Sequence, residues 1–321
     1  MGSESWRQGA AIERPSRHLL KDPCASPLRI SPDLDTLPMI RVILLGRTGN
    51  NLFQYAIGRV LAEKHGVPLY LDATWFNRHG WSEVSHFLLH QQRARVIRGF
   101  SVASRALRKF TGKHHWEYLN VPVVREPVAD QSFNASYLDA PPECVLFGYF
   151  QTPRYFDSMA GPLRDELRAI VSAGSGINAH QHHLATRLAQ GSSVAVHVRR
   201  GDYLRNPLFQ VCGMDHYRRA IGQMRERIPD ARFYFFSDDP AWCRERFRDT
   251  DMETVDSGAA GSNPLHDLHL MSMARHHIIA NSSYSWWAAW LADQADQHVI
   301  MPERWYTRGI KAPIEEKRWK T

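Results

Sequence analysis

The spacing of apolar positions changes sharply near position 39. Residues 1–38 mix Arg, Ser, Pro and Asp without a period, which predicts a disordered tail. Beyond them, a β-branched run at 40–45 is followed by a turn with two glycines and by apolar residues at helical spacing over 53–61. Another short apolar run follows at 69–71. This order predicts a strand, a helix and a second, parallel strand in one βαβ unit.

The second half of the chain repeats this alternation. Apolar runs at 194–198, 233–236 and 278–279 predict buried strands. The Asp-Pro pair at 239–240 and the Asn-Pro pair at 263–264 are typical of helix starts, where the first side chain caps the helix and proline takes its first position. The alternation predicts an α/β protein built from two Rossmann-like, doubly wound domains.

A stretch rich in Gly, Ser and Ala at 172–177 indicates where the two domains divide. We therefore expect an N-terminal domain over 39–178 and a C-terminal domain over 179–321. Ligands of doubly wound sheets bind beyond the carboxyl ends of the strands. The residues that follow each predicted strand are accordingly the candidates for a site.

Composition excludes a disordered chain but narrows the partners only in part. The 321 residues are 43% hydrophobic, which is enough for a full core. The formal charge of +7 favours an acidic partner, and a nucleic acid, an anionic membrane or a nucleoside diphosphate would each provide one. The four cysteines form no CxxC pair, and no apolar run has the length of a membrane span or signal peptide. The sequence therefore predicts a cytoplasmic protein without a zinc site or disulfides.

Two adjacent arginines follow the predicted strand at 194–198. The segment reads His197-Val198-Arg199-Arg200-Gly201-Asp202-Tyr203. A guanidinium group offers a fixed fork of donors that matches phosphate oxygens, and its charge cannot be lost. These properties suit the binding of a diphosphate leaving group without a metal ion. The alternative is an Arg-Asp ion pair on the surface.

Three other groups of residues also follow predicted strands. They are Gly46, Arg47, Gly49 and Asn50; Ser237, Asp238 and Asp239; and Ser282, Ser283 and Tyr284. The first and last open helices, where backbone amides and the helix dipole favour an anion. The first turn matches neither a Walker A loop nor GxGxxG, so it supports neither ATP nor NAD chemistry. Plain packing of the glycines and helix capping by Asp239 are the alternatives.

Two patterns invite a metal site, and we discount both. His266, His269, His276 and His277 provide no i, i+4 pair with a third ligand. The Asp-Thr-Asp segment at 249–251 resembles the metal-binding DxD of some glycosyltransferases, but it lies in a polar loop rather than at a strand end. We therefore expect no metal ion and no other cofactor.

The chain resembles the α-1,2-fucosyltransferase family of bacteria and, more distantly, the α-1,6- and protein O-fucosyltransferases. The matching segments are the Gly-Asn turn with residues 53–56, residues 148–151 with Tyr155 and Phe156, residues 197–203, and residues 267–290. In order and spacing they cover most of residues 40–302. The resemblance implies a GT-B architecture of two facing Rossmann-like domains and metal-independent, inverting transfer of fucose from GDP-fucose. It also implies a glycan acceptor, with O2 of a terminal galactose as the position expected to be modified.

The resemblance assigns roles to most of the candidate residues. Arg199 looks like the β-phosphate arginine, His197 like a contact to the nucleoside, Asp267 like the guanine reader, Ser282, Ser283 and Tyr284 like phosphate and fucose contacts, Asp238 and Asp239 like a second nucleotide-side pair, and Asn50 like the asparagine near the reacting sugar. Many bacterial members have a second glycine where this chain has Arg47. The α-1,6 enzymes carry a glutamate where Pro207 stands, so Asp202 is our candidate for the general base.

Several alternatives stay open at this point. They are an α-1,6 or other linkage, an inactive sugar-nucleotide-binding protein, and a basic nucleic-acid-binding protein, which would need a basic stripe with stacking aromatics that the sequence does not cluster. We expect acceptor contacts in the loops of residues 75–135. Arg105, Arg108, Lys109 and Trp116 there are either a solvated face or a contact to an anionic membrane that carries lipid-linked glycans.

Overall fold

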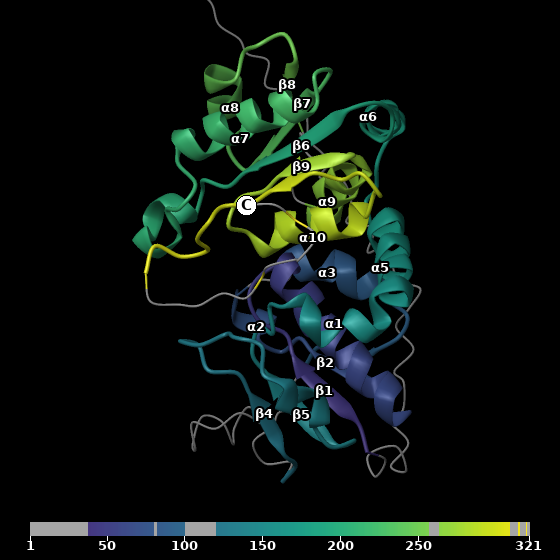
Figure 1. The fold of residues 1–321 in the computed structure, drawn as a ribbon. Helices are drawn as coiled ribbons and strands as arrows, with labels where there is room; N and C mark the ends of the chain where they lie inside the picture. Colours follow the sequence, from purple (N-terminus) through teal and green to yellow (C-terminus); the bar gives the residue numbers. More distant parts are fainter. Residues whose placement is uncertain are drawn as a thin grey trace, which may run out of the picture. The chain divides into compact units, whose positions relative to one another are not determined.

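The computed structural model describes residues 38–79, 82–99, 120–256, 263–308, 314 and 319. The predicted tail lies outside these residues except for Pro38, and so do Arg105, Arg108, Lys109 and Trp116. The strands of the described residues form two five-stranded sheets, both fully parallel, with helices packed around them (Figure 1). The predicted α/β fold with two Rossmann-like sheets of the GT-B type is confirmed, and the domain boundary at 178 stays a prediction.

The first sheet has the strand order β3-β2-β1-β5-β4. Its strands are β1 (Ile40–Ile43), β2 (Leu69–Asp72), β3 (Arg95–Ile97), β4 (Val123–Arg125) and β5 (Cys144–Phe147). Its helices are α1 (Thr48–His65), α2 (Phe76–His79) and α3 (Ser82–His90). The chain leaves β1 toward β2 and later returns to its other side with β5, so the winding reverses beside β1. Such a switch point opens a crevice at the carboxyl end of the strand.

The second sheet has the order β10-β9-β6-β7-β8. Its strands are β6 (Ser193–Val198), β7 (Arg232–Ser237), β8 (Met252–Thr254), β9 (His276–Ile278) and β10 (Val299–Ile300). The remaining helices are α5 (Ala160–Gly174), α6 (Ala179–Ala189), α7 (Met214–Arg227), α8 (Pro240–Arg246), α9 (Pro264–Met273) and α10 (Ser283–Ala292). Here the winding reverses beside β6. The two switch points therefore lie next to the turn after β1 and the arginine segment after β6.

Figure 1 shows α1 and α10 between the two sheets. A cluster of aromatic side chains joins these two helices. The ring of Phe53 lies 4.8 Å from the rings of both Trp286 and Trp287, and Phe156 stacks on Trp287 at 5.4 Å. The indole of Trp287 also donates to the carbonyl of Gly49 at 3.0 Å. All of these rings are fully buried. This packing fixes the N-termini of α1 and α10 against each other.

The chain turns directly after β5. The strand ends at Phe147, and Phe150 takes a left-handed backbone conformation with φ of 52°. The buried carboxylate of Glu126 accepts the backbone N–H groups of Tyr149 and Phe150 at 2.7 and 2.9 Å. A carboxylate that satisfies two turn amides stabilises this unusual geometry. The chain therefore turns at 148–151 and carries Gln151 toward the N-terminus of α1.

Candidate functional site

A cavity of about 740 Å³ lies where the carboxyl ends of the two sheets meet. It is lined by every residue that the sequence singled out for the site except Arg200 and Asp239. Two parts of its lining differ in chemistry. We call Arg199, Asp202, Asp238 and Asp267 the charged wall, and Val128, Gln131, Tyr149, Gln151, Trp305 and Tyr306 the amide wall.

Two helix N-termini open into the cavity side by side. Neither the residue before α1, Arg47, nor the residue before α10, Ser282, caps its helix with a side-chain hydrogen bond. A methyl group on Gly49 would lie 2.5 Å from the backbone nitrogen of Tyr284, so only glycine allows this approach. Two helix N-termini aimed at one space favour an anion through their amides and their dipoles.

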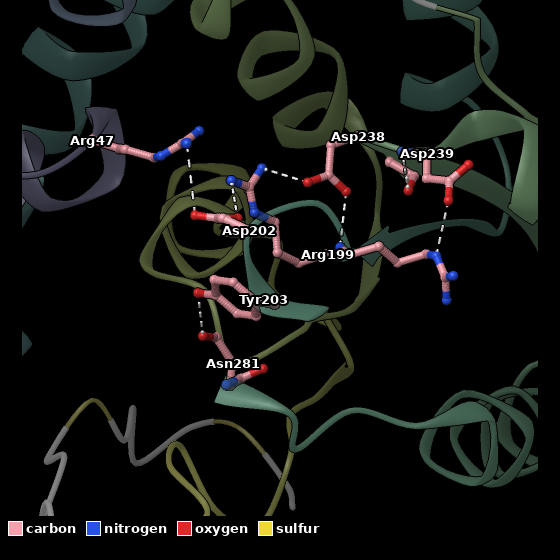
Figure 2. A network of polar contacts seen from close by, with 9 residues as sticks. Arg47, Arg199, Asp202, Tyr203, Asp238, Asp239 and Asn281 are labelled. Carbon is pink, nitrogen blue, oxygen red and sulfur yellow. Dashed lines mark hydrogen bonds and ion pairs between the residues drawn. The ribbon is translucent and has the colours of Figure 1, made fainter. Parts of the chain in front are cut away.

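Arg199 occupies the centre of the charged wall, between two carboxylates (Figure 2). Its Nη2 lies 2.6 Å from Asp202 Oδ1, and its Nη1 lies 3.0 Å from Asp238 Oδ2. Burial acts to lower the pKa of Arg199, but the carboxylates of Asp238 and Asp202 outweigh burial and raise it. The guanidinium therefore stays charged and is held in one orientation at the carboxyl end of β6.

Asp202 and Asp238 are themselves fixed. Arg47, from the turn after β1, places its Nη2 3.7 Å from Asp202 Oδ2, so each oxygen of Asp202 faces a guanidinium. The backbone N–H of Arg200 donates to Asp238 at 2.9 Å, and a methyl group on Gly201 would lie 2.6 Å from the same carboxylate. Asp202 is therefore held from two sides, and its carboxylate becomes free for another partner only after a ligand has drawn those guanidinium groups away.

Arg200 and Asp239 do not line the cavity. The Nε of Arg200 lies 3.0 Å from Asp239 Oδ2, and its guanidinium stacks over Trp242 at 4.0 Å. The other oxygen of Asp239 accepts the N–H of Trp242 at 3.1 Å and caps α8. Asp239 is therefore a helix cap, as the alternative interpretation held, and Arg200 stabilises the start of the same helix.

His197 lines the cavity with an uncharged side chain. Burial and, secondarily, the charge of Arg199 lower its pKa to about 3. It is 6% exposed, and its Nδ1 has no hydrogen-bond partner in the described part of the chain. Its ring lies 5.7 Å from the ring of Tyr284. The imidazole can therefore give or take a neutral hydrogen bond but brings no charge to the cavity.

Asp267 faces the cavity from the first turn of α9, which Asn263 caps. Its Oδ1 lies 2.9 Å from Nδ1 of the fully buried His266. The hydroxyl of Tyr284 bonds to the carbonyl of Pro264 at the start of the same helix. These contacts fix the carboxylate of Asp267 at the edge of the cavity. A fixed carboxylate can accept two neighbouring N–H groups, as the edge of a guanine base presents them.

Asn50 connects the two halves of the protein at the floor of the cavity. Its Oδ1 accepts the hydroxyl of Ser283 at 2.8 Å and the amide of Gln151 at 2.6 Å. With its oxygen engaged by both donors, the amide nitrogen of Asn50 is the group that can donate to a ligand. That nitrogen lies over Gly46, whose φ of 75° and lack of a side chain make room for it.

The residues suspected of binding a metal lie elsewhere. The carboxylates of Asp249 and Asp251 both pair with Arg225 at 2.7 to 2.9 Å. Within the residues that the structure describes, no three His, Cys, Asp or Glu side chains are grouped as a metal ion would require. Metal independence stays a prediction.

The family follows from comparison with known proteins. The model of glycosyl transferase family 11 matches residues 129–320, more than half of the chain. The chain belongs to glycosyl transferase family 11. It is 29% identical over 284 residues to an α-1,2-colitosyltransferase of Escherichia coli. The aligned region covers 83% of this chain and 91% of the relative. It is 25% identical to the galactoside 2-α-L-fucosyltransferase Sec1 of Mus musculus over 89% of the chain and 69% of the relative.

A crystal structure of the NodZ α-1,6-fucosyltransferase soaked with GDP-fucose is also similar to the family 11 enzyme. The match has 14% sequence identity and a TM-score of 0.45, and it covers 79% of this chain and 93% of the other. In the described ranges, none of the helices of the family 11 enzyme combines the length and the apolar character of a transmembrane span.

Sequence reasoning missed the amide wall of the family 11 enzyme. Gln151 stood in a matching segment but received no role, Gln131 was covered only by the expectation of acceptor contacts in residues 75–135, and Tyr306 was not singled out. The available signal was position, because residues 148–151 directly follow the buried strand β5. Gln131 gave no such signal, because it follows a short, half-exposed strand.

Proposed function

We propose that this glycosyltransferase moves L-fucose from GDP-fucose, with inversion, to a glycan hydroxyl, most directly O2 of a terminal galactose. The observation that carries the proposal is Arg199, held between Asp202 and Asp238 beside two helix N-termini. Such an array neutralises charge that grows on a departing diphosphate. Asp267 supports guanine as the base, because its carboxylate suits the N1 and exocyclic amine hydrogens.

The transfer needs one bond to form and one to break at the anomeric carbon. The acceptor oxygen attacks that carbon from the face opposite GDP, and the bond to the β-phosphate oxygen breaks, so GDP leaves with the electron pair. Phosphate oxygens that engage Arg199 and Arg47 would release Asp202 from its guanidinium partners. Its carboxylate could then take the proton of the acceptor hydroxyl.

A comparison of donors tests the proposal. The enzyme is incubated in EDTA with GDP-fucose, GDP-mannose or UDP-galactose and with a panel of galactosides, and nucleoside diphosphate release is measured. We expect turnover with GDP-fucose, slower turnover with GDP-mannose and none with UDP-galactose. Turnover of the UDP-sugar, or none with any donor, contradicts the proposal. Methylation analysis of the product then identifies the linkage, which separates O2 transfer from α-1,6 transfer.

Colitosyl transfer is a second candidate function, favoured by the similarity to the α-1,2-colitosyltransferase over most of both chains. Colitose is L-fucose without its 3-hydroxyl group, so the two donors differ by one polar atom. A site that hydrogen-bonds this hydroxyl rejects the deoxy sugar strongly, whereas a site with an apolar contact there does not. The ratio of kcat/KM for GDP-fucose and GDP-colitose therefore decides between the two donors.

A further inference from the structure

The amide wall carries no charge, unlike the rest of the cavity. Its six residues are two glutamines, three aromatic residues and a valine, and Val128 is 72% exposed at its margin. Aromatic faces and neutral amides are poor partners for phosphate. They suit instead a neutral ligand with both apolar faces and hydroxyl groups.

Two buried oxygen atoms of this wall have no hydrogen bond within the described ranges of the chain. Gln131 and Gln151 are only 3% and 6% exposed, and the Oε1 of each has no partner among the described residues. The opposite end of each amide is occupied: Gln151 donates to Asn50, and the side chain of Gln131 bonds to the hydroxyl of Tyr306. Each amide is therefore fixed with its oxygen unsatisfied, and a buried acceptor in that state favours a donor from a ligand.

The protein stabilises an unusual backbone to keep Gln151 in this place. Phe150 has its left-handed conformation, and the buried carboxylate of Glu126 accepts the N–H groups of the two successive residues Tyr149 and Phe150. A methyl group on Gly148 would lie 2.5 Å from Glu126 Cβ, so the turn and the carboxylate also fit closely. Strain that the surroundings hold at a cavity is typical of a functional position.

We propose that the amide wall is the acceptor subsite and that it binds a neutral sugar, whose hydroxyl groups donate to the carbonyl oxygens of Gln131 and Gln151. This assignment rests on the proposed function only in that the bound sugar is the fucosyl acceptor. The link from Gln151 to Asn50 and Ser283 places the subsite directly beside the two helix N-termini that suit the donor phosphates. Sugars that carry a carboxylate should be excluded, because the wall offers no cation to pair with one.

Binding is measured without catalysis, by saturation-transfer-difference NMR of methyl β-D-galactoside on the enzyme saturated with GDP. We expect a signal that weakens about tenfold with Gln131→Leu and with Gln151→Leu, since each loses one buried hydrogen bond. Gln294→Leu, at an exposed position on the chain, is the matched control and should bind as the wild type does. Methyl β-D-galacturonide should give no signal with any of these proteins.

The outcomes separate this proposal from the function on which it rests. Unchanged galactoside binding in a folded Gln131→Leu or Gln151→Leu protein, checked by its thermal unfolding, overturns the subsite. Binding that depends on both glutamines, together with no turnover of GDP-fucose, keeps the subsite and refutes the donor instead. With an active enzyme, Gln131→Leu should raise the KM for the acceptor about tenfold and leave the KM for the donor unchanged.

Discussion

The charged wall and the amide wall differ in whether their polar atoms have partners within the protein. On the charged wall, the guanidinium of Arg199 is paired with the carboxylates of Asp202 and Asp238, so each of these three charges has an oppositely charged partner without a ligand. On the amide wall, the oxygens of Gln131 and Gln151 have no hydrogen-bond partner among the residues that the structure describes. An unpaired charge in a buried site would be far more costly than an unpaired amide oxygen. A charged ligand must therefore compete with internal ion pairs, whereas a neutral sugar meets vacant acceptors.

We expect the largest effect from a change at the contact between α1 and α10, because this contact positions both walls. In Gly49→Ala the new methyl group would lie 2.5 Å from Tyr284 N, so the two helix starts must separate and both walls shift. We expect kcat/KM to fall about 100-fold, since displacements near 1 Å at a reacting centre have such effects. Gly222→Ala is the control. No atom of the described part of the chain lies within 4 Å of its added methyl group, and the variant should retain activity and unfold at an equal or higher temperature.

Asp267→Asn should affect only the ligand of the charged wall, and therefore tests whether the two walls bind different ligands. An amide cannot accept two guanine N–H groups at once as a carboxylate does, so we expect GDP affinity to fall about 10- to 100-fold. Binding of methyl β-D-galactoside should not change. Competition titrations with GDP, IDP and ADP measure the effect. An unaltered preference for GDP over ADP in the variant would show that another group recognises the base.

Acid should destabilise the half of the protein that carries the charged wall. Burial lowers the pKa of His197 to about 3 and those of His276 and His277 to about 4. A folded-state pKa below the unfolded value stabilises the protein above pH 6.5, and that contribution is lost as the pH falls toward 4, because only the unfolded chain binds the protons. Each such histidine contributes a slope of up to about 1.4 kcal/mol per pH unit.

Urea unfolding at pH 7, 6 and 5 measures this slope. His197→Asn should lose less stability than the wild type between pH 7 and pH 5, because it lacks one of the protonating groups. Equal losses in both proteins would mean that His197 is protonated in the folded state and is not a neutral member of the cavity.

The sequence was sufficient for most of the fold because its signals are local. Proline after Asp239 and after Asn263 marked helix starts that the structure confirms, and the apolar runs marked the strands. The arginine segment and the glycine turn were found because they follow buried strands. Their meeting depends on two reversals of winding, which the spacing of residues does not encode.

The contacts of the amide wall could not be predicted in the same way. Gln131 and Tyr306 are separated by more than half of the chain, and only the tertiary fold brings them into contact. Asp239 could not be assigned for another reason: an aspartate directly after a strand suits both helix capping and nucleotide binding. The contacts of its carboxylate with Arg200 and with the backbone of α8 show that it caps the helix.

The most direct test of the account is calorimetric titration of GDP into the wild type, Arg199→Ala and Arg225→Ala, all in EDTA. Arg225 is the matched control, since it also pairs with two aspartates but lies outside the cavity. We predict micromolar binding to the wild type and to Arg225→Ala, and at least about 100-fold weaker binding to Arg199→Ala, the loss expected for a charged hydrogen-bonded contact to phosphate. Equal GDP affinity in all three proteins would contradict the central claim that Arg199 holds the leaving diphosphate.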